Sequence, residues 1–163
     1  MTSTEDKDWW CKHGSELEKE FVDLTGPQFS LNPDKTYDKY TYDLLYRGEP
    51  ADLKSVRTPF FSSGQYGCDP SHTVTFNLKD LHRYQEYYPN ITVVFWVVWP
   101  SQARFGISVD SIDGVWCYSL DEIATGDAPV HSYQRRRNDT TGNAKSSLLI
   151  QLGEQNRINR PYE

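Results

Sequence analysis

The sequence YDLLYRGEPADLKSV, residues 42–56, has the pattern of a β-hairpin, and we predict the fold from it. Its two arms, residues 39–46 and 51–56, are rich in apolar and aromatic side chains, and the turn signal Arg47-Gly48-Glu49-Pro50 separates them. Three charged side chains, Asp43, Asp52 and Lys54, interrupt these arms. The position of these charges decides whether the hairpin is a plain structural element or the floor of a functional site.

The three charged residues of the hairpin are expected to share one face. A turn centred on residues 48 and 49 places Asp43 opposite Lys54, and because side chains alternate along a strand, Asp52 lies on the same face. Diagonal neighbours on one face are about 7–8 Å apart, so both carboxylates can reach a cation between them. Mg²⁺ takes oxygen ligands and keeps several waters, so two carboxylates and a substrate phosphate suffice. The alternative is an exposed ion pair between Asp43 and Lys54, with Asp52 solvated nearby.

The segments around the hairpin predict an α/β fold. Residues 14–24 have a helical pattern, with Ser15 as N-cap, Glu18 completing a capping box, and Leu17, Phe21 and Leu24 forming an apolar stripe. The remaining expected elements are a loop at residues 28–36, a mobile loop at 58–72, strands at 73–76, 91–99 and 146–152, and a helix at 78–88 capped by Asn77. This order of elements predicts a mixed β-sheet flanked by helices.

Composition and charge restrict the class of protein. A chain of 163 residues is long enough to bury a core without disulfides, so we expect a single domain over residues 1–163. Three widely spaced cysteines indicate neither a disulfide framework nor a zinc knuckle. Residues 1–53 carry 12 acidic and 6 basic side chains, whereas residues 54–163 carry 11 of each. The resulting net negative charge counts against general nucleic-acid binding, unless the basic side chains gather on one face. The polar N-terminus and a longest apolar run of nine residues predict a cytoplasmic protein with no membrane partner.

Two motifs resemble one known family. YDLLYRGEPADLKS is similar to the active-site hairpin of the PD-(D/E)xK nuclease superfamily, in which an Asp, a short turn and Asp/Glu-x-Lys follow one another. HGSELEKEF is similar to the first helix of archaeal Holliday junction resolvases, where a Gly precedes a metal-supporting Glu by four residues. The resemblance implies that Asp43, Asp52, Lys54 and Glu18 are catalytic, and that Asp43, Asp52 and the backbone carbonyl of Leu53 bind Mg²⁺, for which Mn²⁺ can substitute. Lys54 would orient the attacking water.

The resemblance also implies an architecture, and this sequence departs from the family in places. A restriction-endonuclease-like core would cover about residues 14–99, with a C-terminal extension at about 100–163. Tyr42 stands where the family often has Pro, and Glu16 and Glu20 compete with Glu18, Glu20 being the substitute if the helix phase differs. The overall acidity is unusual for a junction resolvase, and it leaves the substrate open.

Basic side chains in three segments are candidates for contacts with nucleic acid. They are Arg57 after the hairpin, Lys79 and Arg83 on the second helix, and Arg135, Arg136, Arg137 and Lys145 in the run QRRRNDTTGNAKSS. For each of them a solvated surface position is the alternative. The adjacent Phe60 and Phe61 could stack on bases, although paired Phe residues are more often core.

Together these features predict a Mg²⁺-dependent DNA endonuclease that works as a homodimer or higher homo-oligomer in a bacterial or phage-encoded setting. One alternative is a nuclease of resolvase or repair type that selects DNA by structure. The other is a catalytically silent member of the fold that binds nucleic acid or a protein.

Overall fold

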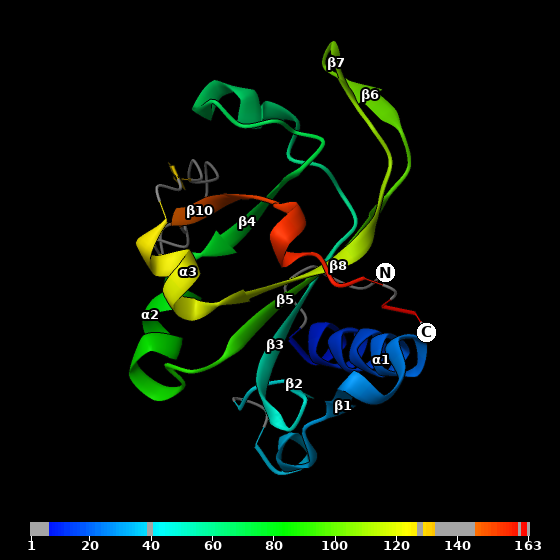
Figure 1. The fold of residues 1–163 in the computed structure, drawn as a ribbon, viewed down its shortest axis with the longest axis vertical. Helices are drawn as coiled ribbons and strands as arrows, with labels where there is room; N and C mark the ends of the chain where they lie inside the picture. Colours follow the sequence, from blue (N-terminus) through cyan, green and yellow to red (C-terminus); the bar gives the residue numbers. More distant parts are fainter. Residues whose placement is uncertain (1–6, 39–40, 127–128, 133–145, 160, 163) are drawn as a thin grey trace.

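A five-stranded sheet organises the fold (Figure 1). The structure is a computed structural model that describes residues 7–38, 41–126, 129–132, 146–159 and 161–162. The strands, in their order across the sheet, are β1 (Phe29–Leu31), β2 (Leu44–Tyr46), β3 (Glu49–Val56), β5 (Thr92–Trp99) and β8 (Ile112–Ser119). Strands β3 and β5 are parallel and the other neighbours are antiparallel. The predicted mixed sheet with flanking helices is therefore confirmed.

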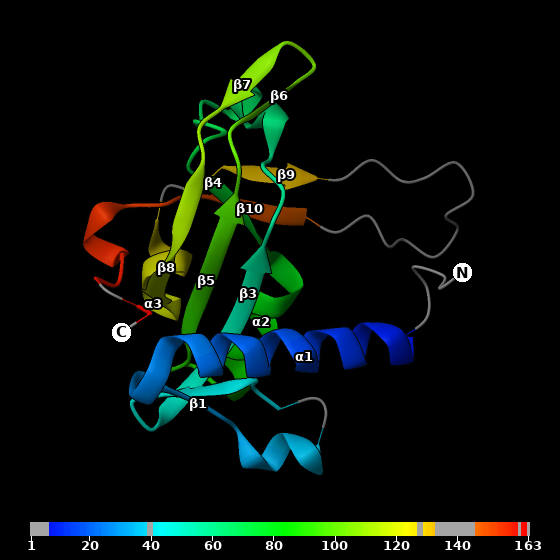
Figure 2. The same cartoon turned by 90° about the vertical axis from the view of Figure 1, so that its right-hand side faces the viewer.

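Helix α1 (Lys7–Thr25) covers one face of this sheet (Figure 2). Its Phe21 is fully buried, with its ring centroid 4.8 Å from that of Phe29 and 5.3 Å from that of Trp96. Leu17 packs against the same cluster, but Leu24 is 45% exposed, so the predicted apolar stripe holds for two of its three members.

The start predicted for this helix is wrong. Helix α1 already includes Lys7, so Gly14 and Ser15 lie inside it and Ser15 is not an N-cap. A glycine in a helix interior costs about 0.5–1 kcal/mol, which is small enough for tertiary packing of the helix to outweigh it. Glu18 therefore sits in the middle of a continuous helix.

The other face of the main sheet carries a second layer. It contains a three-stranded sheet in the order β4 (Thr73–Asn77), β10 (Ser146–Gln151) and β9 (Val130–Ser132), with helices α2 (Leu78–Tyr87) and α3 (Leu120–Thr125). Val93, Phe95 and Val97 of β5 point into this layer and are fully buried. The sequence predicts the strands at 73–76 and 146–152 but not that they form a sheet of their own. Asn77 caps α2 as predicted, since its side chain accepts the Lys79 N–H at 2.8 Å.

Short elements fill two segments that the sequence predicts as loops. Residues 28–36 contain β1 and the 3-10 helix η2 (Pro33–Thr36) instead of a plain loop. Residues 58–72 contain the 3-10 helix η3 (Phe61–Tyr66), in which Phe61 is buried in the core. A two-stranded hairpin of β6 (Gln102–Arg104) and β7 (Ile107–Val109) projects from the body (Figures 1 and 2). Among the described helices, none combines the length and apolarity needed to cross a bilayer.

The register of the β2–β3 hairpin differs from the predicted one by two residues. Tyr46 pairs with Glu49 and Leu44 with Ala51, so the loop consists of Arg47 and Gly48 alone. Both loop residues have positive φ, +50° and +83°, which is the signature of a two-residue turn whose twist matches the strands. The prediction placed Pro50 in the turn, whereas the proline lies inside β3.

A register shift of two residues leaves every side chain on its predicted face. Continued past the end of β2, the observed register places Asp43 opposite Asp52 and not opposite Lys54. Ala51 and Leu53 pack in the cluster beneath α1, so Asp52 and Lys54 face the opposite layer. The expectation that Asp43, Asp52 and Lys54 share one face is thus compatible with the observed pairing.

Candidate functional site

Asp43 lies where β2 and β3 separate. Its Oδ2 accepts the backbone N–H of Leu53 at 3.2 Å, a donor that pairing of Leu53 with Tyr42 would otherwise use if the observed register continued. The carboxylate therefore ends the β2–β3 pairing, and this bond holds it beside the middle of β3. This position places Asp43 close enough to Asp52 for its charge to contribute to raising the pKa of Asp52.

Asp52 is a buried carboxylate with one oxygen that accepts no hydrogen bond from the described residues. It is only 4% exposed, and its Oδ2 has no hydrogen-bond partner within the described part of the chain. The Nζ of Lys54 lies 3.1 Å from this oxygen and forms an ion pair with it. Burial raises the pKa of Asp52 to about 7; Lys54 opposes the rise and the charge of Asp43 adds to it. A carboxyl group with these surroundings ionises near neutral pH.

Lys54 lies between the two layers of the protein. Its Nζ contacts Asp52 on its own strand and donates to Asp80 Oδ2 of α2 at 2.9 Å, and it lies 5.7 Å from the centroid of the Phe76 ring. Burial acts to lower the pKa of this ammonium, but the acidic groups around it, Asp52 first among them, outweigh burial and raise the pKa. Lys54 therefore stays protonated. It can donate hydrogen bonds to a water or to a phosphate oxygen, but it is unsuited to act as a base that removes a proton.

Asp80 links this lysine to helix α2. Its Oδ2 accepts from Lys54, and its Oδ1 lies 3.5 Å from Nη2 of Arg83, one turn further along α2. Arg83 also donates to the hydroxyl of Tyr84 at 3.2 Å. The sequence indicated Arg83 but missed Asp80, because Asp80 and Lys54 are 26 residues apart and only the tertiary fold brings them together.

Glu18 reaches the hairpin through a lysine that the sequence analysis missed. Lys35 Nζ donates to Glu18 Oε1 at 2.6 Å and also to Asp43 Oδ1. Glu18 is 8% exposed, whereas Glu16 and Glu20 are exposed, so of these three candidates Glu18 is the one that lies in the cluster.

Lys35 is held in place by the short helix η2. The side chain of Asn32 caps this helix by accepting the Asp34 N–H at 3.2 Å, and it donates to the carbonyl of Tyr42 at 2.9 Å. This second bond ties η2 to the residue that precedes Asp43. The Asn32-Pro33 pair, a cap followed by a proline at the first helical position, is the signal that could have revealed this element.

The donor set of the cluster suits a hard divalent cation in part. Glu18, Asp43 and Asp52 supply carboxylate oxygens, the ligands that Mg²⁺ prefers, and Asp52 Oδ2 has an unused acceptor. Against this, the Lys35 ammonium already neutralises Glu18 and Asp43, and no group of three or more Asp, Glu, His or Cys side chains in the described ranges has metal-binding geometry. The donor types suit a divalent ion, but with Lys35 on Glu18 and Asp43 and Lys54 on Asp52 the described arrangement is not itself a metal site, and an ion at Asp43 would have to displace Lys35.

The residues proposed for nucleic-acid contacts are dispersed. Arg57 stacks on Trp96, 4.0 Å from the ring centroid, and donates to the Trp96 carbonyl at 3.2 Å, on the opposite face of β3 from Asp52. Lys79 is exposed at the start of α2, and Arg83 is part of the Asp80 network. The basic run that contains Arg135, Arg136, Arg137 and Lys145 lies outside the described residues.

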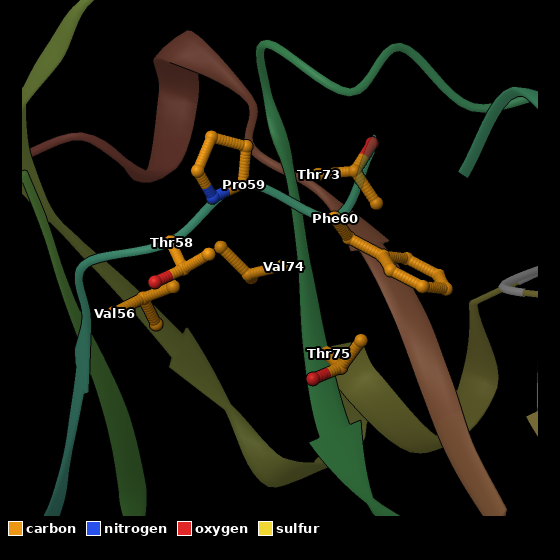
Figure 3. Close-up of a pocket in the computed structure, with 7 residues that line it drawn as sticks. All are labelled: Val56, Thr58, Pro59, Phe60, Thr73, Val74 and Thr75. Atoms are coloured by element: carbon orange, nitrogen blue, oxygen red, sulfur yellow. The ribbon is translucent and has the colours of Figure 1, made fainter. Parts of the chain in front are cut away.

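A pocket of about 150 Å³ adjoins the C-terminal end of β3 (Figure 3). Val56, two residues after Lys54 and on the same face of the strand, contributes to its wall together with Phe60. The rest of the lining consists of Thr58, Pro59, Thr73, Val74 and Thr75. It contains no ionisable side chain, so the charged chemistry of this region is confined to the cluster around Asp43, Asp52 and Lys54.

Comparison with known proteins gives no relative: no family model, no curated protein and no solved structure matches the chain.

Proposed function

We propose that this protein is a Mg²⁺-dependent DNA endonuclease of restriction-endonuclease-like type, with Asp43, Asp52 and Lys54 at its active site. The observation that carries the proposal is Asp52, a carboxylate 4% exposed with one oxygen that accepts no hydrogen bond within the described ranges, close to the carboxyl group of Asp43 and 3.1 Å from the Lys54 ammonium. Such a group costs folding free energy when it is ionised, and perturbed carboxylates of this kind cluster at functional sites.

Each residue of the cluster has a role in this proposal. Asp43 and Asp52 would hold Mg²⁺ with the carbonyl of Leu53, and the bound ion would supply an acidified water and a counter-charge for the scissile phosphate. The Leu53 N–H fixes the Asp43 carboxylate in place. Lys54, which stays protonated, would donate hydrogen bonds to the attacking water or to a phosphate oxygen as charge develops there.

Asp80 would act as a positioning residue. Its bond to Lys54 Nζ at 2.9 Å sets the direction of the ammonium, and Arg83 holds the other oxygen of Asp80 from the same helix. The arrangement fixes the lysine between β3 and α2 without contact between Asp80 and the reacting atoms. Substrate DNA, a homodimeric assembly and a cytoplasmic bacterial or phage setting belong to this proposal as well.

The decisive test is cleavage of plasmid DNA by purified protein with Mg²⁺, Mn²⁺ or EDTA. The proposal expects metal-dependent nicking or linearisation by the wild type and its loss in Asp52→Asn and Lys54→Met. Lys19→Met is the matched control, because Lys19 is an exposed lysine of α1, and it should cut as the wild type does. Absence of cutting on supercoiled, linear and four-way substrates, or full activity in both site variants, would refute the proposal.

One observation favours a second function. The ion pairs of Lys35 neutralise Glu18 and Asp43 within the protein, which is the arrangement expected if the cluster is structural and the chain is a silent member that binds nucleic acid or a protein. The net charge of −6 is consistent with a basic partner protein. Retention of folding and partner binding by a protein that never cuts DNA would support this alternative.

A further inference from the structure

The position between Glu18 and Asp43 already contains a cation. The Nζ of Lys35 contacts Oε1 of Glu18 at 2.6 Å and Oδ1 of Asp43, while the second oxygen of Asp43 is bound by the backbone of Leu53. The side chains are 23%, 11% and 18% exposed for Lys35, Glu18 and Asp43, so water only partly screens these charges. The ammonium is thus a built-in counter-charge for two carboxylates.

The third carboxylate of the cluster, Asp52, has one oxygen that accepts no hydrogen bond in the part of the chain that the structure describes. Asp52 Oδ2 is buried and has no hydrogen-bond partner among the described residues, although Lys54 lies 3.1 Å away. Two ammonium groups therefore accompany the carboxylates of Glu18, Asp43 and Asp52: Lys35 lies at Glu18 and Asp43, and Lys54 lies at Asp52. Asp52 Oδ2 can still accept a ligand. A divalent ion that bridged Asp43 and Asp52 would meet the Lys35 ammonium at Asp43, and like charges at that distance repel each other.

The tether of Lys35 allows the ammonium to leave Asp43. Lysine carries its charge on a flexible four-carbon stem, and Lys35 lies in the short helix η2, which consists of a single turn. Because its ammonium contacts two carboxylates, it can give up Asp43 and remain paired with Glu18. Glu18 would then hold the displaced lysine, a role different from the metal-supporting role that the family resemblance implies.

We propose that Lys35 is a tethered counter-ion that occupies the cation position at Asp43 in the metal-free protein, exchanges with the divalent metal, and stays paired with Glu18 after the exchange. This inference rests on the proposed function, since it requires a metal at Asp43 and Asp52. Its consequence is that the protein binds metal more weakly than its carboxylates allow. The apparent affinity of a site falls in proportion to the fraction of time in which it is free to bind.

The test is titration calorimetry with Mn²⁺ on the full-length protein, alongside thermal unfolding with and without Mn²⁺. Lys35→Met should bind Mn²⁺ about tenfold or more tightly than the wild type, as expected if the ammonium occupies the site at least nine-tenths of the time. The same variant should unfold at a lower temperature in EDTA and show a larger upward shift with Mn²⁺. Lys35→Arg keeps the charge and should bind Mn²⁺ no more tightly than the wild type.

Two further variants make the test specific. Lys19→Met removes an exposed lysine of the same region of sequence and should leave Mn²⁺ affinity unchanged. In Lys35→Met/Asp52→Asn the tight binding should disappear, which assigns it to this cluster. If Lys35→Met alone fails to fold, Lys35→Gln retains the length and polarity of the side chain without its charge and serves in its place.

The outcomes separate this inference from the proposed function. Equal or weaker Mn²⁺ binding by Lys35→Met, with metal-dependent DNA cleavage by the wild type, overturns the role of Lys35 and leaves the nuclease proposal intact. Tighter binding by Lys35→Met without DNA cleavage by any form supports the counter-ion and refutes the nuclease. Failure of every form to bind Mn²⁺ refutes both.

Discussion

Replacement of Asp52 by asparagine should stabilise the metal-free protein at neutral and alkaline pH. Burial raises the pKa of Asp52 from its ordinary value of 3.8 to about 7, so the folded protein holds this proton more tightly than the unfolded chain does. The wild type must therefore lose stability as pH rises from about 4 to about 7. The ceiling on this loss is about 4 kcal/mol, because one pKa unit corresponds to about 1.4 kcal/mol.

The net gain in Asp52→Asn should be smaller than this ceiling. Asparagine carries no charge, so Lys54 keeps only Asp80 as a close partner, at 2.9 Å, and loses the attraction of Asp52. The amide also brings a donor into a buried position, which costs about 1–3 kcal/mol if it finds no acceptor. We expect a gain of about 1–3 kcal/mol at pH 8, where the wild-type carboxylate is ionised.

The assay is urea unfolding in EDTA between pH 4 and pH 9, compared for the wild type, Asp52→Asn and Asp43→Asn. The stability gap between Asp52→Asn and the wild type should open as pH rises towards 7 and then level off. Asp43→Asn should be destabilised instead, because this carboxylate accepts from Lys35 and from the Leu53 N–H. Equal destabilisation of Asp52→Asn at pH 5 and pH 8 would show that the fold accommodates the Asp52 charge, and would refute the reasoning.

Three further predictions concern neighbouring positions. Lys54→Met should lower the rate of DNA cleavage by at least about 100-fold, and it should also destabilise the protein because Asp52 and Asp80 lose the cation that they share. Nicking assays would measure the first effect and urea unfolding the second. Activity within a few-fold of the wild type would contradict the role of Lys54. Asp80→Asn should reduce kcat about 10–100-fold with little change in KM for DNA, because Asp80 acts through the position of Lys54. A change in KM alone would argue against this positioning role. Phe105→Asn should raise the free energy of unfolding by about 0.5–1 kcal/mol, because Phe105 has φ +55° and is 81% exposed, and asparagine tolerates this left-handed conformation better. A loss of stability in urea unfolding would show that the contact of its ring with the Arg104 guanidinium, 5.0 Å from the ring centroid, outweighs the backbone strain.

Local patterns in the sequence were sufficient to predict which hairpin side chains share a face, and to predict several of the helices and strands. Alternation along β3 placed Asp52 and Lys54 together, and this result survived a register error because that error was two residues and not one. The cap at Asn77 and the buried strand β5 were also correct, since each depends on a few consecutive residues. A mixed α/β sheet with flanking helices followed from the order of these elements.

The remaining features depend on contacts between distant segments. Strand β1 has only three residues, too few for a periodic pattern, and it exists because β2 pairs with it. The second sheet joins β4 to β10, more than sixty residues later in the chain, which no local signal specifies. The contacts of Lys35 with Glu18 and of Asp80 with Lys54 span 17 and 26 residues and were invisible for the same reason.

The most direct measurement of the central claim is anomalous diffraction from crystals of the protein grown or soaked with saturating Mn²⁺. The account predicts a single strong peak between the carboxylates of Asp43 and Asp52, with the Lys35 ammonium moved off Asp43 and still paired with Glu18. A fully ordered cluster without an anomalous peak, in which Lys35 still joins Glu18 to Asp43 as it does here, would contradict the assignment of a metal-dependent active site.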